Sequence, residues 1–314
     1  MTIFGPNDTL CAFILDEWTK DVPKAVVDAA EDIARRYGDS VEGVLFYGSC
    51  LRTGEIEEKI LDFYVIVKSY RDAYSGLFLA AANKILPPNV FYHEMDVAGI
   101  TIRSKYAVLS REDLHKRSLP TCLNVSVWAR FCQPCKLLLS KNEETTRQIA
   151  GDVGQTVLTM LSKTLPQVQP GAGSREVWVA AFENTYASEL RSERSGKGLE
   201  IYLLDQDRYD RLSPIAFDIL GHSIDPVELK HQPARWPVVK NRLGWFARRI
   251  NGKLVSFLRL IKASMTFDGG IDYLAWKIKR HSGVEIEIKD WMRRHQIIAG
   301  LTLFWSSRKK GAFK

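Results

Sequence analysis

Two apolar runs separated by a short polar loop decide the fold: Val44-Leu-Phe-Tyr-Gly48-Ser49 and Lys59-Ile-Leu-Asp62-Phe-Tyr-Val-Ile-Val67. Both are rich in β-branched and aromatic residues, which predicts two neighbouring strands with a tight turn at Gly48. The turn offers backbone N–H groups and the Ser49 hydroxyl to a phosphate, while Asp62 offers a carboxylate to a metal ion. This is the minimal equipment for transferring a nucleotide from a triphosphate.

The rest of the 314-residue chain predicts an α/β half followed by a mostly helical half. Further strands are expected over 90–97 and 100–109, and a helix running into a last strand is expected over 125–139. Helices are expected over 21–37, with Asp21 as its cap, and over 175–194, 207–221, 238–250, 253–266 and 270–281. The fold class is therefore α/β (α+β), with a mixed-sheet domain in 1–150, a helical domain in 151–288 and a basic amphipathic segment in 289–314.

The net charge of +7 is concentrated at the C-terminal end of the chain. Residues 291–314 carry six Lys or Arg and no acid, and they end near the cationic run Arg308-Lys309-Lys310. Trp291, Ile298 and Trp305 follow each other at intervals of seven residues, which places them on one helical face. This pattern predicts an interfacial helix on an anionic membrane surface, and the alternative is a C-terminal helix docked on the core.

The cysteine content and the N-terminal residues indicate the cellular compartment in which the protein is expected. Five cysteines without a disulfide framework favour a reducing environment. Cys132-Gln-Pro-Cys135 is a candidate zinc or redox pair, but two further zinc ligands are lacking, and the alternative is two buried side chains. The first 19 residues contain acids but no Lys or Arg, which argues against a signal or transit peptide. No apolar run approaches the ~20 residues that span a bilayer. We expect a cytoplasmic protein, peripheral on the inner face of a membrane.

The Gly-Ser turn resembles the DNA polymerase β-type nucleotidyltransferase superfamily, whose pattern is Gly-Ser, a loop, and then Asp-x-Asp/Glu. Tyr64 stands here in place of the second acid. The same departure is found in one branch of the superfamily, which this sequence resembles: the phosphatidate cytidylyltransferases of the translocator assembly and maintenance type. The resemblance covers about residues 40–280 in the same order. Its motifs are Tyr47-Gly48-Ser49 with Lys59-x-x-Asp62-Phe63, Arg103-Ser-Lys105-Tyr106-Ala-Val-Leu-Ser110, Trp128-Ala-Arg130-Phe-Cys-Gln-Pro134, Thr185-Tyr186-Ala-Ser-Glu189-Leu-Arg191, and Ala263-Ser264 through Gly270-Ile271 to Lys277.

The resemblance implies a reaction between CTP and phosphatidate that gives CDP-diacylglycerol and pyrophosphate, with Mg²⁺ as cofactor. Gly48 and Ser49 would hold triphosphate oxygens, and Asp62 would ligate the metal. The implied phosphate-neutralising cations are Lys59, Lys105 and Arg130. Glu189, Ala129 and Gln133 depart from the family, which has Asp, Gly and Lys there.

The second metal-binding carboxylate is open between two candidates. Glu189 stands in the motif that resembles the family's Ser-Tyr-x-Gly-Asp-x-Arg, within a predicted helix. The alternative is that it belongs to a charge cluster on the helix surface. Glu94 and Asp96 fall two apart on a predicted strand and hence on one face. Alternative functions are nucleotidyl transfer to RNA or a small metabolite, and non-catalytic nucleotide or lipid binding. Nucleic acid is the less favoured partner because the tail lacks the spread of aromatic and basic residues that single strands bind.

Overall fold

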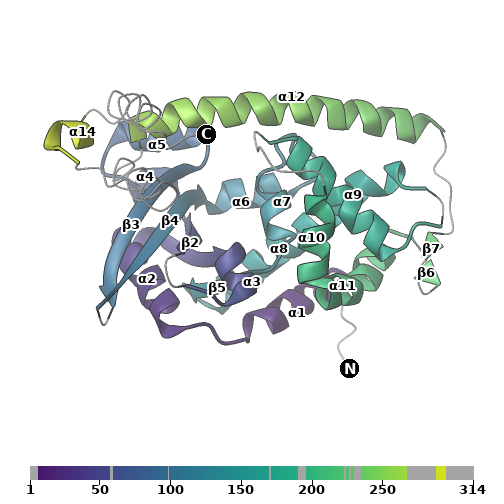
Figure 1. Ribbon diagram of the computed structural model, residues 1–314, viewed down its shortest axis with the longest axis horizontal. Helices are drawn as coiled ribbons and strands as arrows, with labels where there is room; N and C mark the ends of the chain where they lie inside the picture. The colour runs from purple at the N-terminus through teal and green to yellow at the C-terminus, as the bar shows by residue number, and fades with distance from the viewer. Residues whose placement is uncertain are drawn as a thin grey trace, which may run out of the picture.

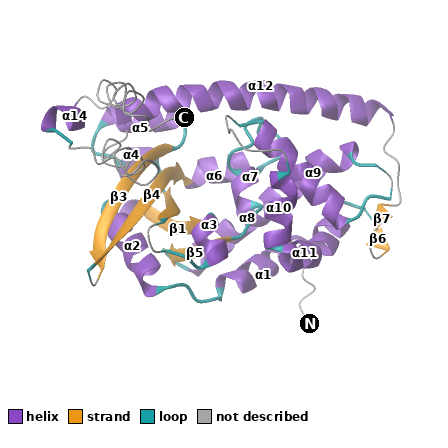
Figure 2. Cartoon of the chain, in the orientation of Figure 1, coloured by secondary structure: helices purple, strands orange, loops and turns teal. Residues whose placement is uncertain are grey.

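The structure is a computed structural model that describes residues 6–56, 59–97, 99–169, 171–189, 196–222, 224–225, 228–229, 235–266 and 288–294. Within them, five strands form one mixed sheet in the order β3-β4-β2-β1-β5, with helices beyond it (Figure 2). β2 runs parallel to β4, and the other neighbours are antiparallel. The predicted α/β fold class is confirmed. The strands are β1 (Val41–Tyr47), β2 (Ile60–Val67), β3 (Asn89–Val97), β4 (Ile100–Ser110) and β5 (Cys135–Ser140).

The apolar run of β2 follows from its central place in the sheet. Residues 63–67 are all buried because both faces of the strand are covered. Phe63 and Val65 pack in a core cluster with Val26 of α2 (Lys24–Arg35), whereas Tyr64 and Ile66 pack in a cluster on the opposite face. Asp62 is on the same face as Tyr64, so the candidate carboxylate points away from α2.

α2 begins after Pro23, so the predicted cap at Asp21 is wrong. A cap at Asp21 would require Val22 to be helical, but the residue before a proline is disfavoured in the α region. Pro23 itself is extended, with φ of −53° and ψ of 137°, and the helix starts at Lys24. The first face of the sheet is completed by α4 (Tyr70–Ala73) and α5 (Leu77–Ile85).

His93 of β3 is buried between two charged residues of the α2 region. Arg36 Nη2 donates to His93 Nδ1 (2.7 Å), which leaves the proton on Nε2, 2.9 Å from Asp32 Oδ2. Burial and the neighbouring Arg36 lower the pKa of His93 below its usual value, although Asp32 opposes the shift. The imidazole is therefore neutral in the folded protein at neutral pH.

We expect the free energy of unfolding to fall as the pH drops below about 6.5, because His93 then binds a proton in the unfolded chain but not in the folded one. The loss should level off only below the lowered pKa of the folded state. His93→Gln keeps an acceptor and a donor and should flatten this part of the pH profile, measured by urea unfolding between pH 7 and pH 5. An unchanged slope would show that other groups govern the acid limb.

The second face of the sheet is covered by helices that also build the helical half. They are α1 (Pro6–Trp18), α6 (Arg111–Ser118), α7 (Trp128–Phe131) and α8 (Glu143–Thr164). The helical half is completed by α9 (Ser174–Ala187), α10 (Lys197–Leu204) and α11 (Gln206–Ile219), whose buried side chains pack in a separate core. α8 contributes Ile149 and Val153 to the core under the sheet, and Val157 and Leu161 to the core of the helical half. The predicted domain boundary at residue 150 falls inside this continuous helix.

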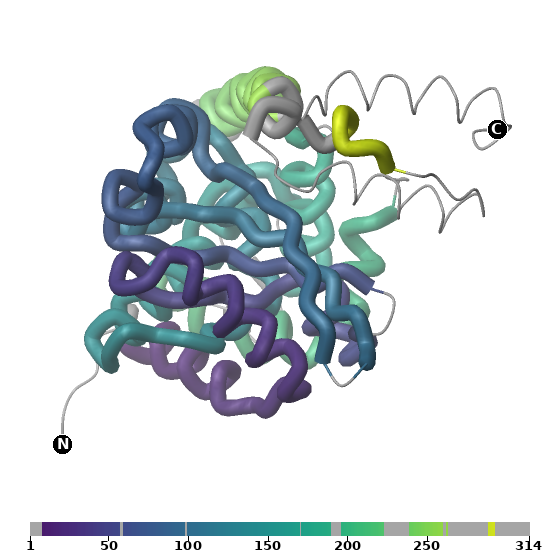
Figure 3. Tube along the Cα trace, turned by 90° about the vertical axis from the view of Figure 1, so that its left-hand side faces the viewer, coloured from purple at the N-terminus to yellow at the C-terminus, as the bar shows by residue number. Residues whose placement is uncertain are grey.

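α12 (Arg235–Thr266) is a single helix of 32 residues, so the predicted break between 250 and 253 is wrong. Gly252 does not end the helix because tertiary contact there outweighs its weak helix propensity. α12 runs along the top of the molecule in Figure 1, and Figure 3 shows it close to end-on at one edge. Trp245 Nε1 donates to Lys163 O (2.9 Å) in the helical half, and Lys262 Nζ donates to Pro88 O (2.7 Å) before β3. The helix thus contacts both the helical half and the sheet half of the molecule.

The remaining elements are short. They are the 3₁₀ turns η1 (Gly38–Ser40) and η2 (Leu165–Gln167), α3 (Ser49–Thr53), the pair β6 (Ile224–Asp225) and β7 (Glu228–Leu229), and α14 (Asp290–Arg294). The predicted helix over 270–281 and the tail after residue 294 lie outside the described residues. No helix in the described ranges is long and apolar enough to cross a membrane.

Candidate functional site

The Gly48 turn and the Asp62 carboxylate lie against each other. Tyr47 at the end of β1 pairs with Asp62 on β2, and the chain then turns at Gly48, with φ of +92°, into α3. A Cβ atom built on Gly48 would lie 3.0 Å from Asp62 Oδ2. The glycine therefore serves both the left-handed turn and the close approach of the carboxylate. Ser49 is exposed at the first position of α3.

A row of four side chains crosses one face of the sheet at this level. Register pairs Tyr92 with Lys105, Lys105 with Asp62, and Asp62 with Tyr47. Asp62 Oδ1 is shielded from solvent, and Lys105 Nζ lies 3.0 Å from it. Burial, and next the negative charge of Asp62, raise the pKa of Tyr47 well above its ordinary value, so this phenol stays neutral. The centre of the row is thus an ion pair flanked by two tyrosines.

Arg130 links this row to the helical half. Its Nη1 donates to Ser126 O (2.6 Å) and lies 3.5 Å from Glu189 Oε1. Burial opposes its charge, but Tyr64, Glu189, Tyr47 and Asp62 outweigh burial and raise the pKa of Arg130. The guanidinium therefore stays charged and interacts with the carboxylates of both Asp62 and Glu189.

Glu189 does not stand inside a helix, as the sequence predicted. α9 ends at Ala187, and Glu189 N donates to Tyr186 O (3.2 Å) in the turn that follows. α12 passes over this turn: a Cβ on Gly252 would lie 1.9 Å from Ser188 O. The neighbouring motif residue Arg191 lies outside the described residues. The end of α9 thus presents the Glu189 carboxylate inward, 13% exposed, to Arg130.

Glu94 and Asp96 share the face of Asp62 but lie further along β3, beyond Tyr92 of the row. Glu94 pairs in register with Arg103, and its Oε1 accepts from Arg103 Nε (3.1 Å) and from the Tyr92 hydroxyl. This position is two strands and two residues away from Asp62, or roughly 12 Å by strand geometry. Asp96 is further along the same strand and accepts from Thr101 Oγ1 (2.9 Å). The structure does not bring either acid to Asp62.

Lys59 precedes β2 and sits in the loop that follows the Gly-Ser turn. Its Nζ lies 3.4 Å from Glu55 Oε2, and the two side chains are 41% and 66% exposed. The strand begins after Lys59, so strand geometry does not force this side chain away from Asp62. The ion pair with Glu55 is a contact within the loop and does not involve Asp62.

Two cations of α12 extend the charged region, and sequence reasoning missed both. Arg259 Nη1 donates to Ser126 Oγ (3.0 Å), beside the carbonyl that Arg130 uses, and Lys262 reaches the backbone before β3. Burial, with Arg130 and Arg117 adding to it, lowers the pKa of Arg259 to about 10. Burial, then Arg259 and Arg117, lower the pKa of Lys262 to about 7. The signal was present in the sequence as two cations one helical turn apart in an otherwise apolar stretch.

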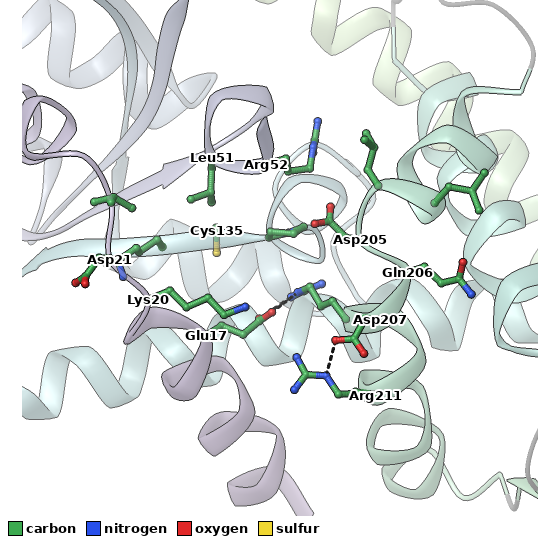
Figure 4. A pocket seen from close by; sticks show the side chains of 16 residues that line it. Glu17, Lys20, Asp21, Leu51, Arg52, Cys135, Asp205, Gln206, Asp207 and Arg211 are labelled. Atoms are coloured by element: carbon green, nitrogen blue, oxygen red, sulfur yellow. Dashed lines mark hydrogen bonds and ion pairs between the residues drawn. The ribbon is translucent and has the colours of Figure 1, made fainter. Parts of the chain in front are cut away.

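A cavity of about 530 Å³ opens on the other side of α3 (Figure 4). Leu51 and Arg52, which directly follow the Gly-Ser turn, line it together with charged residues of α1 and α11. Two of its lining residues, Arg208 and Glu17, make a buried two-point ion pair (Nε–Oε1 2.6 Å, Nη2–Oε2 3.0 Å). Of the candidate site residues predicted from the sequence, only Cys135 of the Cys132–Cys135 pair lines this cavity.

The residues available to a metal ion are few. No group of three or more His, Cys, Asp or Glu converges anywhere in the part of the chain that the structure describes. Cys132 and Cys135 are buried free thiols, and burial raises the pKa of both, that of Cys135 to about 12. They match the interpretation as buried side chains. Mg²⁺ commonly uses one or two carboxylates together with substrate phosphates, and Asp62 is a carboxylate of the type that such a site would need.

Comparison with known proteins found no family model that matches the chain and no curated protein that matches it.

Proposed function

We propose that this chain is a Mg²⁺-dependent nucleotidyltransferase that transfers CMP from CTP to phosphatidate, giving CDP-diacylglycerol and pyrophosphate. The observation that carries the proposal is the contact between the Gly48 turn and Asp62, with the Cβ position of Gly48 3.0 Å from Asp62 Oδ2. A glycine turn of the kind that suits phosphate and a carboxylate of the kind that suits Mg²⁺ therefore lie side by side, which supports the proposal. The resemblance of the Lys59, Lys105, Arg130 and Glu189 segments to the phosphatidate cytidylyltransferases supports the substrate pair.

The reaction requires little covalent work from the protein. A phosphate oxygen of phosphatidate bonds to the α-phosphorus of CTP as the bond from that phosphorus to the β-phosphate bridging oxygen breaks, and pyrophosphate leaves. The attacking oxygen is already anionic, so no strong general base is needed. Asp62, with Glu189 as the second candidate, would hold Mg²⁺, whose charge offsets that of the triphosphate when it is bound.

The cations around the site are suited to two phosphorylated substrates. The side chains of Lys105 and Arg130 are 40% and 25% exposed. Each can therefore exchange its carboxylate partner for a phosphate oxygen of a substrate without a change in the backbone. Arg259 and Lys262 are partly buried near one another, which disfavours their charged forms. A bound phosphate would relieve that cost, because buried cations are stabilised by an anionic partner.

Incubation of the purified chain with phosphatidate and each of the four NTPs, with Mg²⁺, tests the proposal. We expect pyrophosphate release with CTP and a CDP-diacylglycerol product in the lipid extract. Release with CTP and an RNA acceptor instead would assign the same chemistry to another substrate. No turnover with any acceptor would contradict the proposed reaction.

A non-catalytic nucleotide-binding role is the second candidate, and the Lys105 ion pair is the observation that favours it. Lys105 already neutralises the Asp62 oxygen at 3.0 Å, and Tyr64 replaces the usual second acid. Under this alternative, calorimetry would detect CTP binding while CDP-diacylglycerol and pyrophosphate stay absent in the presence of Mg²⁺.

A further inference from the structure

α12 has two opposite faces of different character. Its inward face carries Trp245, Arg248 and Gly252, which are buried against the body of the protein. The opposite face carries six large apolar side chains that are 47% to 64% exposed. They are Val239, Leu243, Phe246, Ile250, Leu254 and Phe257. Their spacing of three or four residues keeps them in one stripe along the outer side of the helix.

Cations flank this outer stripe, and acids are absent from the helix. At ~100° per residue, exposed Arg242, Arg249 and Lys253 fall along one border of the stripe and Lys240 along the other. Arg249 also donates to Asn184 Oδ1 (3.2 Å). Residues 235–266 contain eight Lys or Arg and no Asp or Glu. The outer face of α12 is therefore apolar at its centre and positive at its borders.

A second helix with exposed apolar side chains, α5, lies near the C-terminal end of α12. Lys262 bonds to the carbonyls of Leu86 and Pro88, directly after α5. α5 exposes Leu77, Phe78 and Ile85, the last at 82%. Figure 1 and Figure 3 both show α5 and α12 at the same edge of the molecule. The exposed apolar side chains of α5 therefore lie at the same edge of the molecule as α12.

We propose that the outer face of α12, together with α5, is the surface by which this protein lies on an anionic lipid membrane. Large apolar side chains along one face of a long helix can enter the boundary between headgroups and acyl chains, while cations on both borders meet lipid phosphates. This surface is distinct from the basic segment 291–314 and stands independently of the proposed reaction.

Charge complementarity selects a lipid surface over a second copy of the chain. Two α12 helices packed stripe to stripe would bring their bordering cations together, and no acid on either helix could neutralise them. An anionic bilayer supplies the missing negative charge over the whole length of the helix.

Co-sedimentation with vesicles tests this surface without using the reaction. The full-length chain should bind vesicles of phosphatidylcholine with phosphatidylglycerol, bind pure phosphatidylcholine more weakly, and dissociate at high salt. The double variant Phe246→Glu/Phe257→Glu should reduce binding to the anionic vesicles at least about tenfold, since it places two acids in the stripe. The matched control Leu203→Glu/Leu204→Glu changes two α10 side chains that are 52% and 53% exposed and should bind like the unmodified chain.

Three outcomes would overturn the proposal. They are absence of binding to the anionic vesicles, equal binding by the double variant, and a dimer in light scattering that the double variant converts to a monomer. Circular dichroism checks the fold, and the single variant Leu254→Glu provides a milder change of the same face. Activity on detergent-dispersed phosphatidate should survive in the double variant, so failure of the membrane surface and failure of the proposed reaction are told apart.

Discussion

Replacing Asp62 with Ala should abolish CDP-diacylglycerol formation, with a loss of at least about 10³-fold in kcat/KM. The reason is that Asp62 is the carboxylate that touches the Gly48 turn, and no other described acid lies in that contact. Asp62→Asn keeps the shape but removes the charge, so it should be nearly as inactive. Initial rates of radiolabelled CTP incorporation into lipid measure both variants.

The fold should survive the Asp62 substitution. Lys105, its ionic partner, is 40% exposed and can be solvated, so we expect a stability change of about 1 kcal/mol or less. Asp96→Ala is the matched control, since it removes an exposed acid from the same sheet face but away from the turn. Full activity in Asp62→Ala, or an equal loss in Asp96→Ala, would contradict the assignment of the site.

Gly252→Ala should be the most damaging single methyl addition in α12. The new Cβ would lie 1.9 Å from Ser188 O, a backbone atom that cannot swing aside like a side chain. Either α12 or the end of α9 must move, which we expect to lower the free energy of unfolding by about 3 kcal/mol. Because Glu189 follows Ser188 directly, activity should fall together with stability.

Gly244→Ala is the control for this prediction because it is in the same helix. Its Cβ would approach only Arg248 Nη1, at 2.9 Å, the end of a flexible side chain. Removing a helical glycine there should leave stability unchanged or raise it by up to about 1 kcal/mol. Thermal unfolding of both variants measures the difference, and equal melting temperatures would show that α12 does not pack on the α9 turn.

Much of the sheet could be predicted because its signals are local. The runs ending at Tyr47 and Val67 and the hairpin at Gly99 follow from residue type and turn chemistry. The continuity of α12 could not be predicted, because Gly252 has the same local signature at a helix end and at a close helix crossing. Only the position of the Ser188 carbonyl distinguishes the two.

The candidate site was predictable in its centre but not at its borders. Gly48 and Asp62 are linked by an adjacent strand pair, so their meeting follows from the spacing of the two runs. Glu189 reaches Arg130 through the end of α9, and Arg259 arrives from a helix more than 100 residues later. Such contacts depend on how the helical half packs on the sheet, which has no short-range signature in the sequence.

The path of α8 has a mechanical consequence. A rotation of the sheet half against the helical half would have to bend this helix between Val153 and Val157, where its buried side chains pass from one core to the other. Packed cores resist such bending because they are dense and lose contacts outright when they part. Substrates would then enter by rearrangement of side chains and short loops, and a fragment ending at residue 150 would leave the apolar side of a severed helix in water.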